Sequence, residues 1–308
     1  MLAIRIGQII KASLLVLFLS SMPAKADMQL VLLGTGTPNP VPERAGAASA
    51  VIVNGQPWII DAGPGVVRRI SAAHRSGVEA LDQPNLSRAL ITHLHSDHTL
   101  GLPDLIYSPW TLERTEPITI MGPKGVTEMA SHIEKAYSAD TSNRLSGAEP
   151  ANKTGLKIHA SDVAPGVIYQ DSALTIEAIP VCHGDWKQSY GYKFTHDGKS
   201  IVISGDTTYC PTIEAAAMGA DILLHEVYDT DALAKRDNAW QKYHKAAHTS
   251  GIDLGELAAK AQPKHLILTH QLAWSGSKEA ILDQVRQSFT GKLTWGEDLM
   301  VFDLKRTK

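Results

Sequence analysis

The stretch Leu90-Ile91-Thr92-His93-Leu94-His95-Ser96-Asp97-His98 places three imidazoles and one carboxylate within six residues, directly after a short apolar run. A strand that ends in such a cluster places it at the edge of a sheet, and His93 and His95 then project to the same side. The cluster can offer two nitrogens to one metal ion, and Asp97 and His98 to a second. Neutral imidazole and carboxylate are ligands of zinc, and less selectively of iron or manganese.

Further possible metal ligands follow other apolar runs of the chain. Three such runs end at His183, Asp206 and His270, and a shorter one leads to His248 ahead of a predicted helix. A lone histidine after a strand is usually structural. Together with the first cluster, however, these residues supply enough ligands for two metal ions.

The predicted elements are strands followed by helices, and this order occurs twice. Because sheets bury one face against helices and the other against a second sheet, the pattern predicts two facing sheets with helices outside. We therefore expect an α/β protein with a four-layer αβ/βα sandwich, formed as one domain by residues 27–308. Residues 139–155 are polar and predicted to be a loop. Strands are predicted at 28–33, 49–53, 57–61, 88–92, 117–121, 156–160, 167–170, 173–180, 190–195, 200–204, 221–224, 264–269, 292–295 and 299–304.

The first 26 residues have the form of a signal peptide: a basic start, a short apolar core and an Ala-x-Ala end at Ala26. The alternative is an uncleaved anchor, but the apolar core is short for a spanning helix. These features predict a protein exported to the periplasm or the medium, with no later membrane segment. Cleavage removes Arg5, Lys11 and Lys25 and takes the net charge from −3 to about −6. Such a chain, without a basic block, is a poor candidate for binding long nucleic acid.

The two cysteines, Cys182 and Cys210, each lie beside a proposed metal ligand. Export permits a disulfide, but two small buried thiols are the plainer interpretation.

The order of the motifs resembles the metallo-β-lactamase superfamily. The resemblance is carried by Thr92-His93-x-His95-x-Asp97-His98, by His183, by Asp206 in Gly-Asp-Thr and by His270 in Leu-Thr-His. The opening Leu33-Gly34-Thr35-Gly36-Thr37-Pro38 with Arg44, and the later Leu224-His225-Glu226 and Ala247-His248-Thr249, are similar to ribonuclease Z-like proteins, a branch that includes arylsulfatase-like enzymes and phosphodiesterases.

The resemblance implies a role for each of these residues. His93, His95 and His183 would bind one zinc ion, Asp97, His98 and His270 a second, and Asp206 would bridge them. Asp61 would orient the histidine loop from outside the ligand set. Two zinc ions could hold a hydroxide as nucleophile. Asp97 would accept its proton, and His248 with Glu226 would protonate the leaving oxygen. The resemblance also allows a homodimer.

One departure from ribonuclease Z directs the functional prediction. Its tRNA-processing members carry a long arm between the equivalents of His183 and Asp206, whereas only 22 residues separate them here. Together with export and acidity, this favours a zinc-dependent hydrolase of phosphodiester or sulfate esters, with a small anionic substrate. The alternatives are a β-lactamase or lactonase, a ribonuclease Z-like RNA endonuclease, and a non-catalytic metal-binding protein.

Residues 227–247 lie between Glu226 and His248 and carry Trp240, Tyr243 and His244. We expect this segment to cover the metal site and pack an aromatic group of the substrate. The alternative is an ordinary surface helix. Trp110 and Trp186 are further candidates for the wall of the site.

Overall fold

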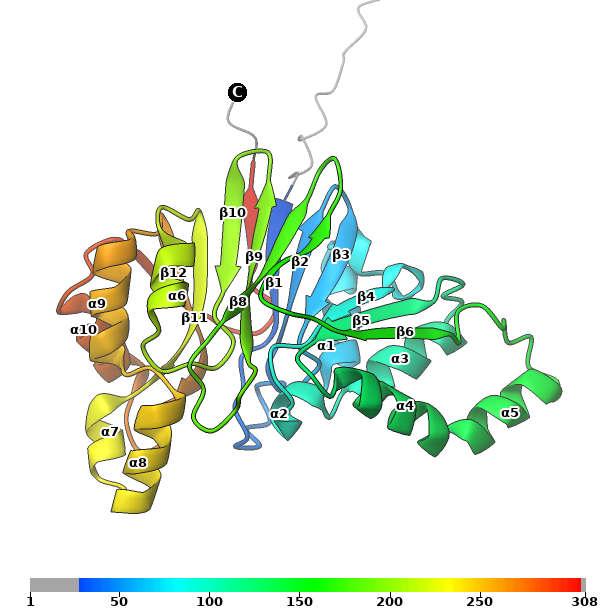
Figure 1. Cartoon of the computed structure of the whole chain (residues 1–308), viewed down its shortest axis with the longest axis horizontal. Coiled ribbons are helices and arrows are strands. Elements are labelled where there is room, and N and C mark those ends of the chain that lie inside the picture. Colours follow the sequence, from blue (N-terminus) through cyan, green and yellow to red (C-terminus); the bar gives the residue numbers. More distant parts are fainter. Residues whose placement is uncertain (1–27, 306–308) are drawn as a thin grey trace, which may run out of the picture.

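Two seven-stranded mixed sheets form the centre of the protein in a computed structural model, which describes residues 28–305 (Figure 1). The predicted signal peptide at 1–26 lies outside the described residues. The first sheet has the order β14 (Val301–Leu304), β1 (Met28–Gly34), β2 (Ala48–Val53), β3 (Gln56–Ile60), β4 (Arg88–Leu90), β5 (Ile118–Gly122) and β6 (Ile158–Asp162). The second has the order β13 (Lys292–Trp295), β12 (His265–Leu272), β11 (Ile222–Tyr228), β10 (Lys199–Ile203), β9 (Tyr190–His196), β8 (Thr175–Pro180) and β7 (Gly166–Gln170).

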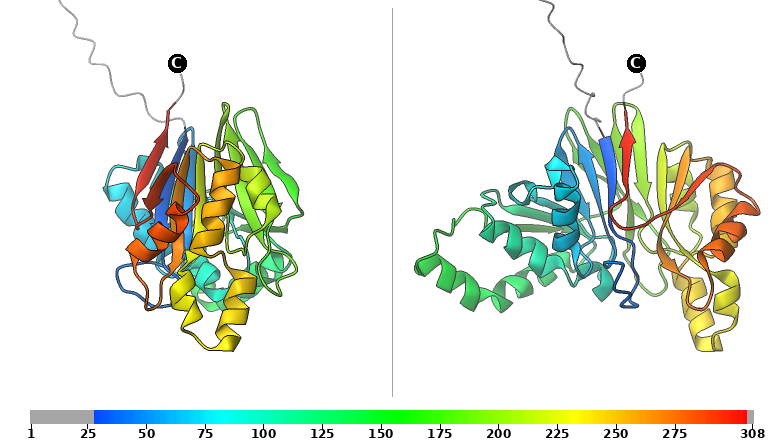
Figure 2. Two further views of the ribbon diagram at one scale, coloured as in Figure 1. Left: turned by 90° about the vertical axis from the view of Figure 1, so that its left-hand side faces the viewer. Right: turned by 180° about the vertical axis from the view of Figure 1, so that it is seen from behind.

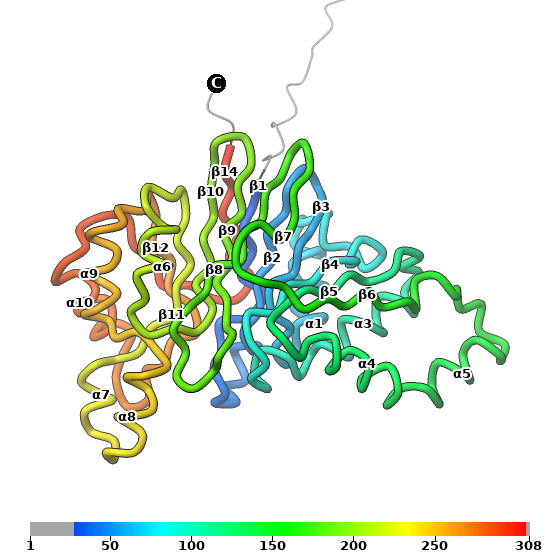
Figure 3. Tube along the Cα trace, viewed as in Figure 1, coloured from blue at the N-terminus to red at the C-terminus, as the bar shows by residue number. Residues whose placement is uncertain are grey.

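Helices cover the outer face of each sheet, so the four-layer αβ/βα sandwich is confirmed (Figure 2). The helices of the first half of the chain are α1 (Val66–Arg75), α2 (Ser96–Thr99), α3 (Leu102–Thr111), α4 (Val126–Ala136) and α5 (Ser138–Ser146), with 3-10 turns at Glu79–Leu81 and Gln83–Asn85, and α5 projects beyond the sheet (Figure 3). Those of the second half are α6 (Pro211–Ala217), α7 (Thr230–Ala234), α8 (Asn238–Ala247), α9 (Gly251–Ala261) and α10 (Lys278–Arg286). Among residues 28–305 no helix is both long and apolar enough to cross a bilayer.

Strand β1 shows why an apolar run forms a central strand here. Its side chains alternate between two cores: Met28, Leu30 and Leu32 pack between the sheets, while Val31 and Leu33 pack against the helices of the first layer. Because successive residues of a strand face opposite sides, a strand buried on both faces must be apolar throughout.

The polar segment 139–155 is not the continuous loop that we predicted. Ser138–Ser146 forms helix α5, which extends away from the sheets (Figure 1). None of its residues is buried, so the helix lacks the apolar periodicity on which the prediction depends. Ion pairs from Arg144 to Asp140, four residues earlier, and to Glu149 support it instead.

Arg114 joins four segments of the first layer and should be a major source of stability. Its fully buried guanidinium donates hydrogen bonds to the carbonyls of Leu86, Ile106 and Gly155 at 2.8–3.0 Å. Arg114→Ala removes the donor that these carbonyls share and leaves a cavity, and we expect the free energy of unfolding to fall by about 3–5 kcal/mol in urea titrations. Arg144→Ala, at the exposed helix α5, is the control and should change it little. Equal stability of the two variants would contradict this role of Arg114.

Candidate metal centre

Three of the predicted ligands converge on one point between the sheets. His93 follows β4, and its Nε2 lies 3.0 Å from His95 Nδ1. His183 follows β8, and its Nε2 lies 3.2 Å from the same His95 atom. Ligand atoms of a tetrahedral zinc ion, with bonds of about 2.0–2.1 Å, are roughly 3.3 Å apart. The spacing of these nitrogens therefore fits a metal ion among them.

The other predicted ligands form a second group beside the first. His270 Nε2 lies 3.1 Å and His98 Nε2 3.5 Å from Asp97 Oδ2. Asp206 lies between the groups: its Oδ2 is 3.4 Å from His98 Nε2, 3.7 Å from His270 Nε2 and 3.8 Å from His93 Nε2. One carboxylate thus reaches both groups, as the predicted bridging ligand must.

Hydrogen bonds outside the cluster fix the histidine rings. The Thr92 hydroxyl donates to Asp61, so its oxygen can accept from His93 Nδ1 at 3.0 Å. His183 Nδ1 donates to the Ala247 carbonyl at 2.7 Å. Each bond places the ring proton on Nδ1 and leaves the lone pair of Nε2 facing the cluster, as metal binding requires.

Asp61 organises the loop that carries the first cluster. Its carboxylate accepts hydrogen bonds from the Thr92 amide and hydroxyl and from His98 Nδ1, all at 2.8 Å. Asp61 itself has a φ of 61°, a conformation that is rare outside glycine. His98 Nε2 is buried without a hydrogen-bond partner among the described residues. The Asp61 contact thus aims an unsatisfied nitrogen at the site.

Burial and charge set different protonation states across the cluster. Burial opposes protonation of His98 and His270, but Asp206 and the other nearby carboxylates outweigh it and raise the pKa of both rings, so a metal ion must displace a proton there. Burial lowers the pKa of His93 well below its ordinary value and that of His95 to about 4, so both rings are neutral at pH 7. Burial opposes ionisation of Asp206, but His270 and His98 outweigh it and hold its pKa well below the ordinary value. Buried carboxylates need cations, and neutral imidazoles supply lone pairs.

His270 reaches the site through an irregularity in strand β12. We predicted His270 just after a strand that ends at Thr269, but His270 lies inside β12. At this point the pairing of β12 with β11 shifts register, between Glu226 and Val227 of β11. His270 is the extra residue of this bulge and has a φ of 45°. Bulges redirect side chains, and this one turns His270 toward Asp97.

His248 and Glu226 form a buried pair beside Asp206. His248 Nδ1 lies 3.4 Å from Glu226 Oε2, while Glu226 Oε1 accepts from the Thr249 amide at 2.9 Å. Burial raises the pKa of Glu226 well above its ordinary value and lowers that of His248 to about 4. A neutral Glu226 can donate its proton toward His248 Nδ1, which has no other hydrogen-bond partner among residues 28–305.

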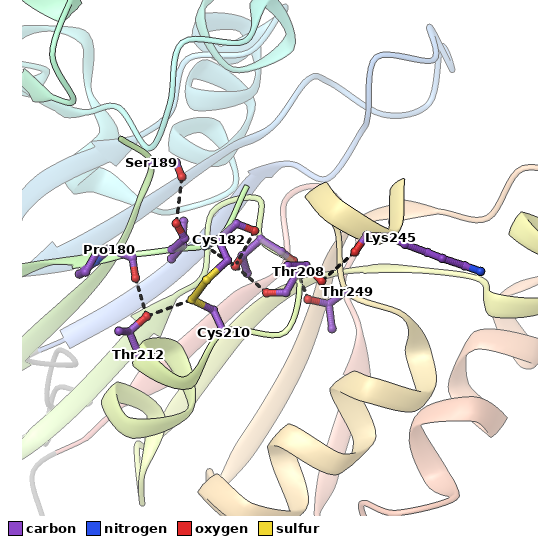
Figure 4. Close-up of a disulfide and its surroundings, with 10 residues drawn as sticks. Pro180, Cys182, Ser189, Thr208, Cys210, Thr212, Lys245 and Thr249 are labelled. Atoms are coloured by element: carbon purple, nitrogen blue, oxygen red, sulfur yellow. Dashed lines mark hydrogen bonds between the residues drawn. A yellow bond between two sulfur atoms is a disulfide. The ribbon is translucent and has the colours of Figure 1, made fainter. Parts of the chain in front are cut away.

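Cys182 and Cys210 form a disulfide, the pairing that the sequence left open beside the plainer interpretation of two thiols (Figure 4). Their Cα atoms are 5.7 Å apart, and the Cys182 carbonyl accepts a hydrogen bond from the Thr208 amide at 2.8 Å. The bridge therefore joins the loop of His183 to the loop of Asp206.

A cavity of about 740 Å³ opens onto the cluster and is lined on one side by helix α8. Trp240, Tyr243 and His244, from the segment predicted to cover the site, line it, whereas Trp110 is buried against Asn152 away from it. The Trp186 indole N–H donates to His95 Nε2 at 2.7 Å. A metal at His95 Nδ1 requires the ring proton on Nε2, so this indole has to turn aside.

The sequence prediction missed Arg236, Trp274 and Asn39, which also line this cavity. Two of them had a usable signal: Arg236 lies within the predicted covering segment 227–247, and Trp274 follows the ligand His270 by four residues.

Comparisons with known proteins agree with this fold and donor set. The profile of the β-lactamase superfamily domain matches residues 58–271. Ribonuclease Z of Mycobacterium marinum is 30% identical over 277 residues, which cover 88% of this chain and 97% of that protein. Ribonuclease Z of a further Mycobacterium species is 32% identical over 247 residues, or 80% and 84% of the two chains.

Solved structures support the fold. The metallo-β-lactamase fold protein YhfI of Bacillus subtilis has a TM-score of 0.70 at 17% identity, covering 91% of this chain and all of that one. The short form of human tRNase Z has a TM-score of 0.65 at 23% identity, covering 89% and 98%. The architecture and the cluster are thus those of a metallohydrolase. The chain belongs to the metallo-β-lactamase superfamily, in its ribonuclease Z-like branch.

Three predictions are wrong in the light of these relatives. The small-molecule ester hydrolase and its small anionic substrate are contradicted, because the relatives matched along nearly their whole length are named for RNA. The exclusion of nucleic acid relied on net charge, which is a whole-chain average and ignores local cations. The predicted export is contradicted as well by the match to proteins named ribonuclease Z and tRNase Z, and its basis at residues 1–26 lies outside the described residues.

Proposed function

We propose that this protein is a metal-dependent RNA endonuclease of the ribonuclease Z type. The observation that carries the proposal is the 30% identity to ribonuclease Z along 97% of that protein's length. The seven predicted metal ligands stand together in two groups that share Asp206. The short interval between His183 and Asp206 holds only β9 and β10, so RNA must be held by other parts of the surface.

We assign His93, His95 and His183 to one cation, Asp97, His98 and His270 to a second, and Asp206 to both. Nitrogen and carboxylate donors in this ratio suit zinc, with manganese or iron as alternatives. When bound, two such cations supply a water nucleophile at neutral pH and neutralise charge on the phosphate. The fit is supported by the unpartnered His98 Nε2 and by the buried carboxylates of Asp97 and Asp206.

The chain's own residues then handle the protons. Asp97 lies at the floor of the cavity and can accept a proton from the attacking water. His248 also lines the cavity, and its Nδ1 faces Glu226. Because burial keeps Glu226 protonated, a proton can pass from Glu226 through His248 to the leaving oxygen.

Cations lie on both sides of this floor, despite the acidic chain. Arg44, Arg68 and Arg69 line a groove that reaches Asp97. The Arg68 side chain is 85% exposed and lies 3.7 Å from Asp104, and Arg69 pairs with Asp298 at 3.1 Å. Lys242, on helix α8, lines a second groove beside His95 and His183. An RNA backbone that runs from one groove to the other would cross the metal centre, and this arrangement favours a polynucleotide substrate.

The test is cleavage of a tRNA transcript extended at both ends and labelled at each end, using zinc-loaded full-length protein. We expect internal cleavage at one position, lost on chelation and restored by zinc, with a KM that rises with salt. Asp206→Ala should abolish it. An enzyme that hydrolyses bis-nitrophenyl phosphate but leaves this transcript and other structured RNAs intact would overturn the proposal.

A further inference from the structure

We propose that the cavity beside the metal centre binds one nucleobase of the nucleotide that adjoins the scissile phosphate. The inference rests on the proposed function and specifies how the substrate is positioned. The cavity, of about 740 Å³, has the size of a small-molecule site and suits a single nucleotide rather than a folded RNA. Asp97, Asp206 and His270 form its floor, so an occupant lies next to the reacting phosphate.

Aromatic side chains of helix α8 form one wall of the cavity. Trp240 and Tyr243 are 46% and 43% exposed, and their ring centroids are 6.0 Å apart. Large aromatic side chains rarely remain exposed together without a binding role. Every base offers a flat face to such rings, and stacking does not depend on the base's identity.

Arg236 supplies a planar cation between two indoles. Its guanidinium lies 5.2 Å from the Trp240 ring centroid and 5.3 Å from that of Trp274. No carboxylate among residues 28–305 lies within ion-pair distance of it, and its buried Nε has no hydrogen-bond partner there. The cavity therefore holds an uncompensated charge and free donors, which match the acceptor edge of a base or a nearby phosphate.

Trp274, which lines the cavity beside helix α8, is held in an unusual backbone conformation. Its φ is 45°, and its ring lies 4.8 Å from that of His244. Strain at a non-glycine residue persists only where the surroundings enforce it, and such positions cluster at ligand sites. Trp274 follows the bulge of His270, so the turn that places a metal ligand also places this wall.

A continuous series of rings connects the cavity wall to the metal ligands. Trp240 stacks on His244 at 5.6 Å, His244 lies 5.4 Å from His248, and His248 stacks on His270 at 5.8 Å. A base stacked on Trp240 would thus belong to the nucleotide on the His248 side of the scissile phosphate. This is the side on which His248 is proposed to protonate the leaving oxygen. We infer that stacking there fixes which phosphodiester bond reaches the metals.

The experiment pairs an enzyme variant with a substrate variant. RNA cleaved by the wild type is remade with an abasic nucleotide on either side of the scissile bond, and both are tested with wild type, Trp240→Ala and Trp240→Phe. For intact RNA we expect Trp240→Ala to raise KM about 5- to 100-fold, and Trp240→Phe much less. At one of the two positions, removal of the base should raise the KM of the wild type by the same factor. With Trp240→Ala, removal of that base should raise KM no further. Tyr137→Ala, at an exposed tyrosine before α5, is the matched control and should behave as wild type.

The outcomes separate the two claims. If Trp240→Ala raises KM by the same factor for intact RNA and for both abasic RNAs, the base-binding site is wrong while the endonuclease proposal stands. If the wild type cleaves no RNA, the proposed function fails. Isothermal titration calorimetry then tests the cavity alone, with adenosine 5′-monophosphate against ribose 5-phosphate. Equal affinity for the two ligands would overturn the base site, and tighter binding of the nucleotide, lost in Trp240→Ala, would support it.

Discussion

Asp97→Ala is expected to lower kcat for RNA cleavage by about 10³-fold while the protein keeps one of the two metal ions that we propose. Asp97 is predicted both to ligate one cation and to accept the proton of the attacking water, and general-base catalysis alone is worth about 10²–10⁴-fold. Its Oδ2 is 3.1 Å from His270 Nε2 and 3.5 Å from His98 Nε2, so its loss disrupts that group. His93, His95 and His183 remain together in the other group.

Two measurements on the purified variant check this expectation. Elemental analysis should give about one metal per chain instead of two, and thermal unfolding should show that the variant is folded. Asp303→Ala serves as the control, because that aspartate accepts a hydrogen bond from Gln29 at the exposed edge of the first sheet. A folded Asp97→Ala variant with two metals and wild-type kcat would refute the role of Asp97.

His248→Ala is expected to reduce kcat about 10²–10⁴-fold without removing metal, because His248 is predicted to protonate the leaving oxygen. The loss should depend on the leaving group. Nitrophenolate leaves without a proton, so hydrolysis of bis-nitrophenyl phosphate should fall far less than cleavage of RNA. Glu226→Gln should produce a smaller loss on RNA, since the amide can still donate a hydrogen bond to His248 Nδ1 but cannot pass on a proton.

Metal content decides whether His248 has this role. Asp206, His248 and His270 also lie close enough to hold a cation together. If His248→Ala loses a metal ion and cleaves both substrates equally poorly, His248 is a ligand and the proton-transfer role is wrong. His159→Ala, at an exposed position of strand β6, is the control for the loss of a histidine.

The layers and the ligand cluster were predictable because both depend on local patterns. Apolar runs such as Met28–Leu33 identify strands buried on both faces, and His93 to His98 is a dense run of ligands in one loop. The placement of His270 inside β12 was not predictable, since the bulge arises from its pairing with β11. Helix α5 was missed because none of its residues is fully buried and its sequence is largely polar, so it lacks the apolar periodicity that identifies a helix.

The substrate was mispredicted because global properties were used for a local question. Net charge is an average over the whole chain, and the interval between His183 and Asp206 gives only the length of one segment. A polynucleotide, however, contacts the surface near the metals. Arg68 and Lys242 lie on opposite sides of the centre although the chain is acidic. The cation Arg236 and its aromatic neighbours Trp240 and Trp274 come from separate segments, and only the folded chain brings them together.

The disulfide has a consequence for how the centre is assembled. Cys182 and Cys210 are 28 positions apart, and the covalent ring that they close contains β9, β10 and, near the closure, both His183 and Asp206. Closing a loop of this length removes about 3–4 kcal/mol of chain entropy from the unfolded state. Two donors of one metal ion therefore stay near each other even in an unfolded oxidised chain. Such a ring can capture a cation before the sheets form, so metal should accelerate refolding of the oxidised chain more than that of the reduced one.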